Sequence, residues 1–244
     1  MLNSFLTGIE LFNMKKIAAL CFWGFGFLMA CDQEIGTPGS TVTEQRPTAN
    51  FGTVFFGGNF NVFIEPDTVY SVKITGDEKV LPHIQTLVYD GRLTIKYDEF
   101  KENFEHETVA VYLKGPFVYS IDQGGSGSIT STLTTVTHAN ISGGGKIDML
   151  VAGDPIKITV NGSGNAYLRG TSDYIEAVIY GSGSVYASGL QTKRAKVVIA
   201  GSGSCELNIS DFLQAIINGS GNISYSGNPV VTQNINGSGK LIKK

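Results

Sequence analysis

A glycine triplet recurs at nearly constant spacing through the second half of the chain. Gly-Ser-Gly occurs six times, and Gly143-Gly144-Gly145 fills the one gap in the series. The triplets begin at Gly125, Gly143, Gly162, Gly181, Gly201, Gly219 and Gly237. Successive triplets start 18, 19, 19, 20, 18 and 18 residues apart. A repeat of this length is one supersecondary unit, which cannot bury its own apolar face and must stack on its neighbours.

Apolar residues recur at fixed distances from each triplet. Two residues before the first glycine the chain carries Ile141, Val160, Ile179, Ile199, Ile217 and Ile235. Four residues after it lie Ile129, Ile147, Ala166, Val185, Cys205, Ile223 and Leu241. Further apolar positions follow every second residue on both sides, and this period of two predicts strands with one face turned inward.

Because the same columns return in every repeat, the sequence predicts an all-β fold, a parallel β-helix or β-solenoid with 18–20 residues per coil. Equivalent side chains would stack about 4.8 Å apart. The triplet glycines would form corners, where glycine reaches positive φ and allows close backbone approach. These corner positions are Gly125, Gly127, Gly162, Gly164, Gly181, Gly183, Gly201, Gly203, Gly219, Gly221, Gly237 and Gly239. A second corner is expected in mid-repeat, at Gly153, Gly170, Gly189 and Gly227.

Two other architectures compete with the solenoid. A flexible Gly/Ser linker would not carry registered Ile and Val columns. An antiparallel barrel or sandwich explains glycine turns, but it does not explain why each column returns in every repeat.

The region before the repeats lacks the triplet but keeps the period of two. Strands are predicted over 61–65, 69–75, 86–89, 92–97 and 108–113, with a hairpin turn at Asp90-Gly91 and one helical turn within 76–84. We interpret residues 50–120 as irregular first coils and an N-terminal β cap, continuous with the repeats at 121–244 in a single domain. A separate small β-domain is the competing interpretation. The charged window Asp98–Glu107 is expected to be a solvated loop, with a recognition loop as the alternative.

The first thirty residues have the layout of an export signal. Met14-Lys15-Lys16 precedes a short apolar run, which ends in Leu28-Met29-Ala30-Cys31. This ending resembles a bacterial lipobox, which implies lipidation of Cys31 and attachment to a membrane through the lipid. A transmembrane anchor is disfavoured because the run is shorter than the ~20 residues a span needs. Residues 1–30 are thus predicted to be a signal peptide, with Met14 as an alternative start, and residues 31–49 a flexible lipidated tether.

Familiar catalytic and binding patterns are missing from the sequence. The net charge is −3, so nucleic acid is not an expected partner. The three histidines share no ligand spacing, and we expect no metal, no cofactor and no catalytic residues. Cys205 lies in an inward column, where a buried apolar role is expected.

Two outward features have possible functional meaning. Asp154 and Asp173 lie eleven residues past their glycines and Asp211 lies ten past, so they would stack near one corner. They are either turn caps or the carboxylates of a sugar-cleaving site. Tyr167 and Tyr186 would stack on adjacent coils, either as a ligand-binding surface or as mutual cover for the strands.

The chain resembles a known family in its repeat and its leading segment. Val160–Gly164, Ile217–Gly221 and Ile235–Gly239 carry the repeat motif, and Asn61–Glu65 the leading segment. These residues are similar to the putative auto-transporter adhesin, head GIN domain family, over roughly residues 50–240. The resemblance implies a right-handed parallel β-helix and an exported protein of Bacteroidetes-type bacteria, at the outer membrane or cell surface. The function expected is a non-enzymatic, lipid-anchored adhesin that contacts a glycan or protein. The alternatives are a carbohydrate-active β-helix enzyme and a structural envelope protein.

Overall fold

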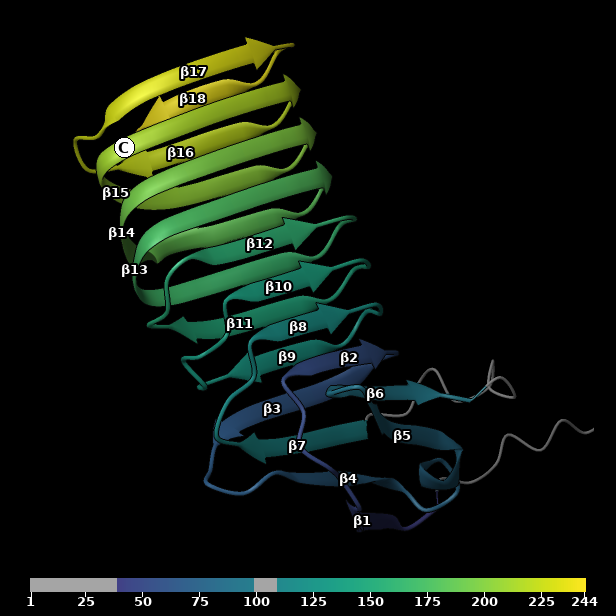
Figure 1. The fold of residues 1–244 in the computed structure, drawn as a ribbon. Coiled ribbons are helices and arrows are strands. Elements are labelled where there is room, and N and C mark those ends of the chain that lie inside the picture. Colours follow the sequence, from purple (N-terminus) through teal and green to yellow (C-terminus); the bar gives the residue numbers. More distant parts are fainter. Residues whose placement is uncertain (1–38, 99–108) are drawn as a thin grey trace, which may run out of the picture. The chain divides into compact units, whose positions relative to one another are not determined.

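In the described part of the computed structural model, eighteen strands form a single hydrogen-bonded sheet that winds around one core (Figure 1). The structure describes residues 39–98 and 109–244. The strands are β1 (Thr41–Arg46), β2 (Thr53–Gly57), β3 (Phe60–Pro66), β4 (Ser71–Asp77), β5 (Ile84–Tyr89), β6 (Arg92–Tyr97), β7 (Val109–Gly115), β8 (Ser120–Gln123), β9 (Ser128–Ser131), β10 (His138–Ile141), β11 (Lys146–Val151), β12 (Ile156–Val160), β13 (Asn165–Gly181), β14 (Ser184–Gly201), β15 (Ser204–Gly219), β16 (Asn222–Ser226), β17 (Val230–Asn236) and β18 (Lys240–Lys243). Residues 38–244 make one compact unit.

Parallel pairing stacks the repeats into two walls. The first wall consists of β8, β10, β12, the C-terminal halves of β13, β14 and β15, and then β17. The second wall consists of β9, β11, the N-terminal halves of the same long strands, and then β16 and β18. Ile179 pairs with Ile199, which pairs with Ile217, so matching residues occupy neighbouring layers. The predicted parallel β-solenoid is confirmed.

Each glycine triplet turns the chain from the first wall into the second and stacks on the triplet of the preceding coil. The backbone amides of Ser182 and Gly183 both donate to the carbonyl oxygen of Gly162, at 3.0 and 2.9 Å. Gly181 has φ of 135°, and a Cβ there would lie 2.6 Å from the same Gly162 oxygen. The outer glycines of a triplet are needed because the corner below already fills the space of a side chain.

The core is a set of aliphatic columns between the walls. The column two residues before each triplet is fully buried from Ile141 to Ile217, and Cys205 takes its place in the other column between Val185 and Ile223. Fully burying one such aliphatic side chain stabilises the fold by about 1.5–3 kcal/mol. The repetition of these columns therefore gives every coil a reason to stack on its neighbours.

The second, mid-repeat corner is formed differently from the first. At Gly170 and Gly227, φ is 117° and 98°, and a Cβ would contact the carbonyl oxygens of Val151 and Ile209 in the coil below. The long strands β13, β14 and β15 pass this corner without interruption. Their register shifts there, between Ala187 and Gln191 for example, so residues at equal distance from the triplet no longer lie opposite each other.

Two coils without the triplet precede the repeats in the stack. β2 and β3 turn at Gly57-Gly58, and they pair in parallel with β8 and β9. A Cβ on Gly125 would contact the backbone of Gly58, so Gly58 occupies the place of the first triplet glycine. On their other side β2 and β3 pair with β6 and β7, which form a further layer although they come later in the chain. Residues 99–108 link β6 to β7, so nearly all of the predicted charged loop lies outside the described residues.

Antiparallel strands close this end of the stack, as the predicted β cap requires. β4 pairs with β7 and β1 with β4, while β5 pairs with β6 through a hairpin. Asp90 and Gly91 form its turn with φ of 47° and 70°. The helical turn expected within 76–84 is the 3₁₀ helix η1 (Leu81–His83). Arg46 ties β1 to it by donating a hydrogen bond of 2.8 Å to the Leu81 carbonyl oxygen.

One boundary predicted from the sequence is wrong. Residues 31–49 were expected to be a flexible tether, yet β1 occupies Thr41–Arg46 within it. Its alternating pattern of half-buried and exposed residues shows why: Val42 packs against the core while its neighbours face solvent. A strand of this kind is stabilised by pairing with β4 and not by its own composition.

The layer formed by β17 and β18 is less well covered than those before it. Val231, Ile235 and Leu241 continue the inward columns but are only partly buried, whereas their counterparts in the preceding coil, Leu213, Ile217 and Ile223, are fully buried. In the described chain no further coil lies on β17 and β18, which pair on one side only.

Candidate functional site

A groove with a volume of about 740 Å³ follows the mid-repeat corner across successive coils. This volume lies within the usual range of ligand sites, about 300–1,000 Å³. The groove is lined by Ala152, Gly153, Asp154, Thr171, Ser172, Asp173, Gln191, Thr192, Lys193, Asn208, Ile209, Ser210, Gly227 and Asn228. Five coils each contribute two or three of these residues, almost all of them polar or glycine.

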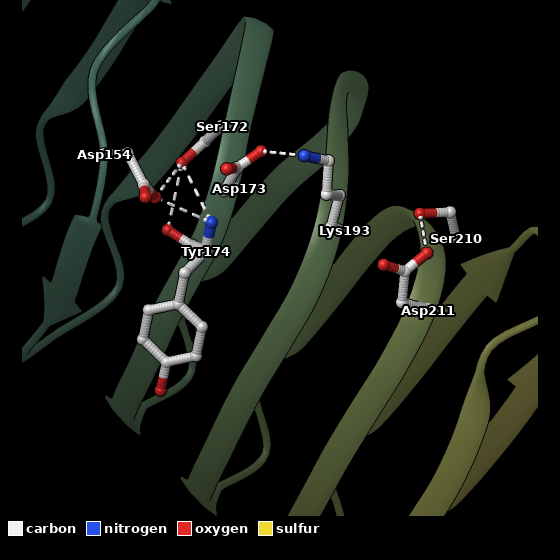
Figure 2. Close-up of polar contacts among 7 residues, drawn as sticks. All are labelled: Asp154, Ser172, Asp173, Tyr174, Lys193, Ser210 and Asp211. Atoms are coloured by element: carbon white, nitrogen blue, oxygen red, sulfur yellow. Dashed lines mark hydrogen bonds and ion pairs between the residues drawn. The ribbon is translucent and has the colours of Figure 1, made fainter.

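Asp154 caps the corner of the next coil, which stacks on the coil that contains Asp154 (Figure 2). Its Oδ1 accepts a hydrogen bond of 2.8 Å from the backbone amide of Tyr174 and one of 3.2 Å from the Ser172 hydroxyl. The Ser172 hydroxyl also lies 3.0 Å from the Tyr174 carbonyl oxygen. Asp154 thus satisfies a backbone donor that the turn leaves free, which is the usual use of Asp at turns.

Asp173 forms an ion pair with Lys193 of the next coil, at 2.8 Å between Oδ1 and Nζ (Figure 2). The pKa of Lys193 is raised, first by the hydrogen bond and charge of Asp173 and more weakly by the charges of Asp211 and Asp154. Asp211 accepts a hydrogen bond of 2.5 Å from the Ser210 hydroxyl. Asp173 and Lys193 are both largely exposed, so their ion pair orders the corner without much stabilising the fold.

The structure brings the three carboxylates predicted to share a corner into one region, as neighbours around Lys193. Asp154 and Asp173 line the groove, while Asp211 lies beside the lining residue Ser210. Each of the three already has a hydrogen-bond or ion-pair partner within the described chain.

The amide and hydroxyl groups of the groove were not singled out from the sequence. Thr171, Gln191 and Asn208 form a register-aligned row across three coils. They lie nine, ten and seven residues past their glycines, so counting from the triplet does not align them. The bulges in β14 and β15 cause this difference, and the only sequence signal was the abundance of Asn, Gln, Ser and Thr in mid-repeat.

Tyr167 and Tyr186 stack on the outer face of the second wall. Their ring centroids are 4.8 Å apart, with an angle of 19° between the planes. The Lys146 ammonium lies 4.7 Å from the Tyr167 ring centre, and Tyr186 pairs in register with Glu206 on its other side. Since the rings turn their faces to each other and to Lys146, the two tyrosines cover the strand surface and present mainly ring edges to solvent. Their role as a ligand-binding surface stays a prediction.

Cys205 is fully buried, and burial raises the pKa of its thiol far above the ordinary value. Because only the thiolate is strongly nucleophilic, this cysteine is an inert member of the core. Cys31, the predicted lipidation site, lies outside the described residues. Within residues 39–98 and 109–244, no three His, Cys, Asp or Glu side chains lie close enough together to hold a metal ion. In the same ranges, no helix has the length and apolar character needed to cross a membrane.

A family model described as "Putative auto-transporter adhesin, head GIN domain" matches residues 50–229, which includes the first coils, the cap strands β4 and β5 and nearly all of the repeats. The chain belongs to this family. Comparison with curated proteins finds no match to this chain. The head GIN domain therefore comprises the triplet-free layers as well as the glycine-triplet coils.

Solved structures of Bacteroidetes proteins share the fold. A "putative adhesin" from Bacteroides fragilis is 21% identical with a TM-score of 0.76, over 84% of this chain and 97% of that one. A "putative lipid binding protein" from Parabacteroides distasonis is 23% identical with a TM-score of 0.67, over the same shares. A "putative adhesin" from Parabacteroides merdae is 22% identical with a TM-score of 0.59, also over 84% and 97%. At these identities the likeness establishes the solenoid fold.

Proposed function

We propose that this protein is a non-enzymatic adhesin of the bacterial cell envelope, anchored by lipid at Cys31 and presenting its solenoid at the cell surface. The family's description and the adhesin names of the structural neighbours support the adhesive role. The lipobox-like Leu28–Cys31 supports the anchor. The stacked coils suit this role because each layer packs on its neighbours, and outward side chains are held at fixed positions along the stack.

One observation carries the non-enzymatic part of the proposal, namely the engagement of the corner carboxylates. A glycoside hydrolase needs one carboxyl group free to give a proton and a second free to act as base or nucleophile. Here Asp154 accepts hydrogen bonds from a turn, Asp173 pairs with Lys193, and Asp211 accepts from Ser210. Turn capping explains the contact of Asp154, the ion pair with Lys193 explains that of Asp173, and a hydrogen bond from the neighbouring hydroxyl explains that of Asp211. The carbohydrate-active alternative would require at least two of these contacts to be broken.

The anchor and the adhesive role are tested together by comparing wild-type cells with cells that express Cys31→Ser, in an adhesion assay and by membrane fractionation. We expect Cys31→Ser to leave the membrane fraction and adhesion to fall to the level of cells lacking the protein. Cys205→Ala is the control, since that thiol is buried in the core and carries no lipid, and alanine places no polar group there. Wild-type cells that adhere no better than cells lacking the protein would refute the adhesive role.

The enzymatic alternative has its own readout. Asp154→Asn and Asp173→Asn keep the side-chain size but remove the carboxylate, so either change would abolish polysaccharide turnover at this corner. We expect the wild-type protein to release no reducing sugar from the polysaccharides it binds. Turnover by the wild type that both variants lose would establish the enzyme and overturn the proposal.

A further inference from the structure

The groove along the mid-repeat corner contains polar groups that the fold leaves without partners. Within the described chain, the side-chain amides of Gln191 and Asn208 make no hydrogen bond, and they lie opposite each other in register. Thr171 continues the same row one coil earlier. A row with one side chain per coil repeats about every 4.8 Å along the stack.

Thr192 adds an observation independent of this row. The residue is 5% exposed and lines the groove, and its Oγ1 has no hydrogen-bond partner in the described structure. Leaving such a group unsatisfied destabilises the fold. Its counterpart Ser172 in the neighbouring coil is satisfied by Asp154 and by the Tyr174 backbone (Figure 2). The oxygen itself is covered, so rotation of the Thr192 side chain toward the groove would be needed for a ligand hydroxyl or a ligand-held water to complete its hydrogen bonding.

The charges around the groove restrict the ligand further. Among the described residues, Lys193 is the one cation that lines the groove, and Asp173 already pairs with it. Asp154 and Asp211 add negative charge close to Lys193, as the rise in its pKa reflects. A polyanion would meet net repulsion here, whereas uncharged hydroxyl groups can donate to the carboxylates and exchange hydrogen bonds with the amides.

We propose that the groove is a binding site for a neutral glycan chain lying along the stack, with sugar hydroxyls bonded to Gln191, Asn208 and Thr192. This inference rests on the proposed adhesive function and names its ligand class. An extended peptide advances about 3.3 Å per residue, so its polar groups would fall out of step with a row spaced by about 4.8 Å. The peptide is therefore the disfavoured occupant and becomes an outcome of the test.

The test uses the full chain in detergent, applied to immobilised mannan, dextran and mixed-linkage β-glucan. Polygalacturonate and alginate serve as acidic probes, and an extended Gly/Ser peptide as a further probe. We expect binding to at least one neutral polysaccharide, and a more than tenfold weaker apparent affinity for the double variant Gln191→Ala, Asn208→Ala. The matched control is Gln214→Ala, Asn234→Ala, which removes the same two amides from exposed positions on the first wall. The control should bind like the wild type.

Thr192→Val separates ligand binding from a packing defect. Valine keeps the shape and removes the unsatisfied oxygen, so the thermal midpoint should rise or stay unchanged while neutral-glycan binding falls severalfold. A Thr192→Val protein that binds at wild-type affinity would assign the hydroxyl to packing and remove Thr192 from the site.

The remaining outcomes decide the proposal. Failure to bind any of the three neutral polysaccharides, a preference for the acidic probes or the peptide, or full binding by the double variant would each overturn it. Cell adhesion distinguishes this failure from failure of the proposed function. Cells that carry the double variant and adhere like wild type would keep the adhesin and exclude the groove.

Discussion

Gly181 and Ser182 are adjacent in one corner, yet the structure gives them opposite tolerance to substitution. Gly181 combines φ of 135° with a Cβ position 2.6 Å from the Gly162 oxygen, whereas Ser182 points its side chain to solvent. We expect Gly181→Ala to lower the free energy of unfolding by more than about 2 kcal/mol, and Ser182→Ala to change it by less than about 0.5 kcal/mol. Urea unfolding midpoints measure both, and equal effects would contradict the stacked-corner geometry.

Single residues of the columns could be predicted from the sequence, whereas those of the groove could not. The columns beside the triplet could be predicted because a period of two is strict within a strand, and Ile179 and Ile199 do face each other. The groove residues could not, because bulges at the mid-repeat corner break the count from the triplet. Thr192 lies opposite Ser172 on one side but opposite Ile209 on the other.

At the scale of elements, β1 is the strand whose role is least evident from its composition. Val42 faces the core and is half-buried, while Gln45 of the same strand is exposed. A carboxylate in place of Val42 would be partly desolvated without a partner. Val42→Asp should therefore lower the free energy of unfolding by about 1–3 kcal/mol. Gln45→Asp introduces the same residue into the same strand and should cost under about 0.5 kcal/mol. Thermal unfolding of the two variants compares them, and similar midpoints would mean that β1 does not cover the cap.

Strands β1 and β2 were not predicted, because neither carries a strong local sequence signal. β2 ends at Gly57-Gly58, and without the serine this corner does not match the triplet, although Phe56 and Val62 occupy the expected column positions around Gly58. β1 has only one strongly apolar inward residue, and its neighbourhood is rich in turn residues. In contrast, the Asp90-Gly91 hairpin was predictable because its turn chemistry is local.

At the scale of the whole unit, the order of layers follows from pairing between distant segments. The layer of β6 and β7 lies on the far side of β2 and β3 from the repeats, although β6 and β7 come between them in the chain. Local patterns do not encode this insertion, since strands of similar composition could pair in either order. The triplet coils, which follow one another in both sequence and space, were predictable for the opposite reason.

Stability within such a stack should follow the number of neighbouring layers. Each coil contributes through its own residues and through contacts with the coils on either side, so a layer covered on one side opens more easily. Ile199 and Ile235 test this because they occupy the same column, the first fully buried and the second half-buried. Ile199→Ala should cost about 3–4 kcal/mol and Ile235→Ala about 1 kcal/mol, because a partly exposed site leaves less of a cavity.

Hydrogen exchange gives the same comparison without mutation. Amides of β14 should exchange only with global unfolding, whereas those of β17 and β18 should exchange faster through local opening. The two measurements must agree, because both report how much of a layer's burial depends on its neighbours. Uniform protection along the stack, together with equal costs for the two isoleucines, would show that the layers unfold as one cooperative block.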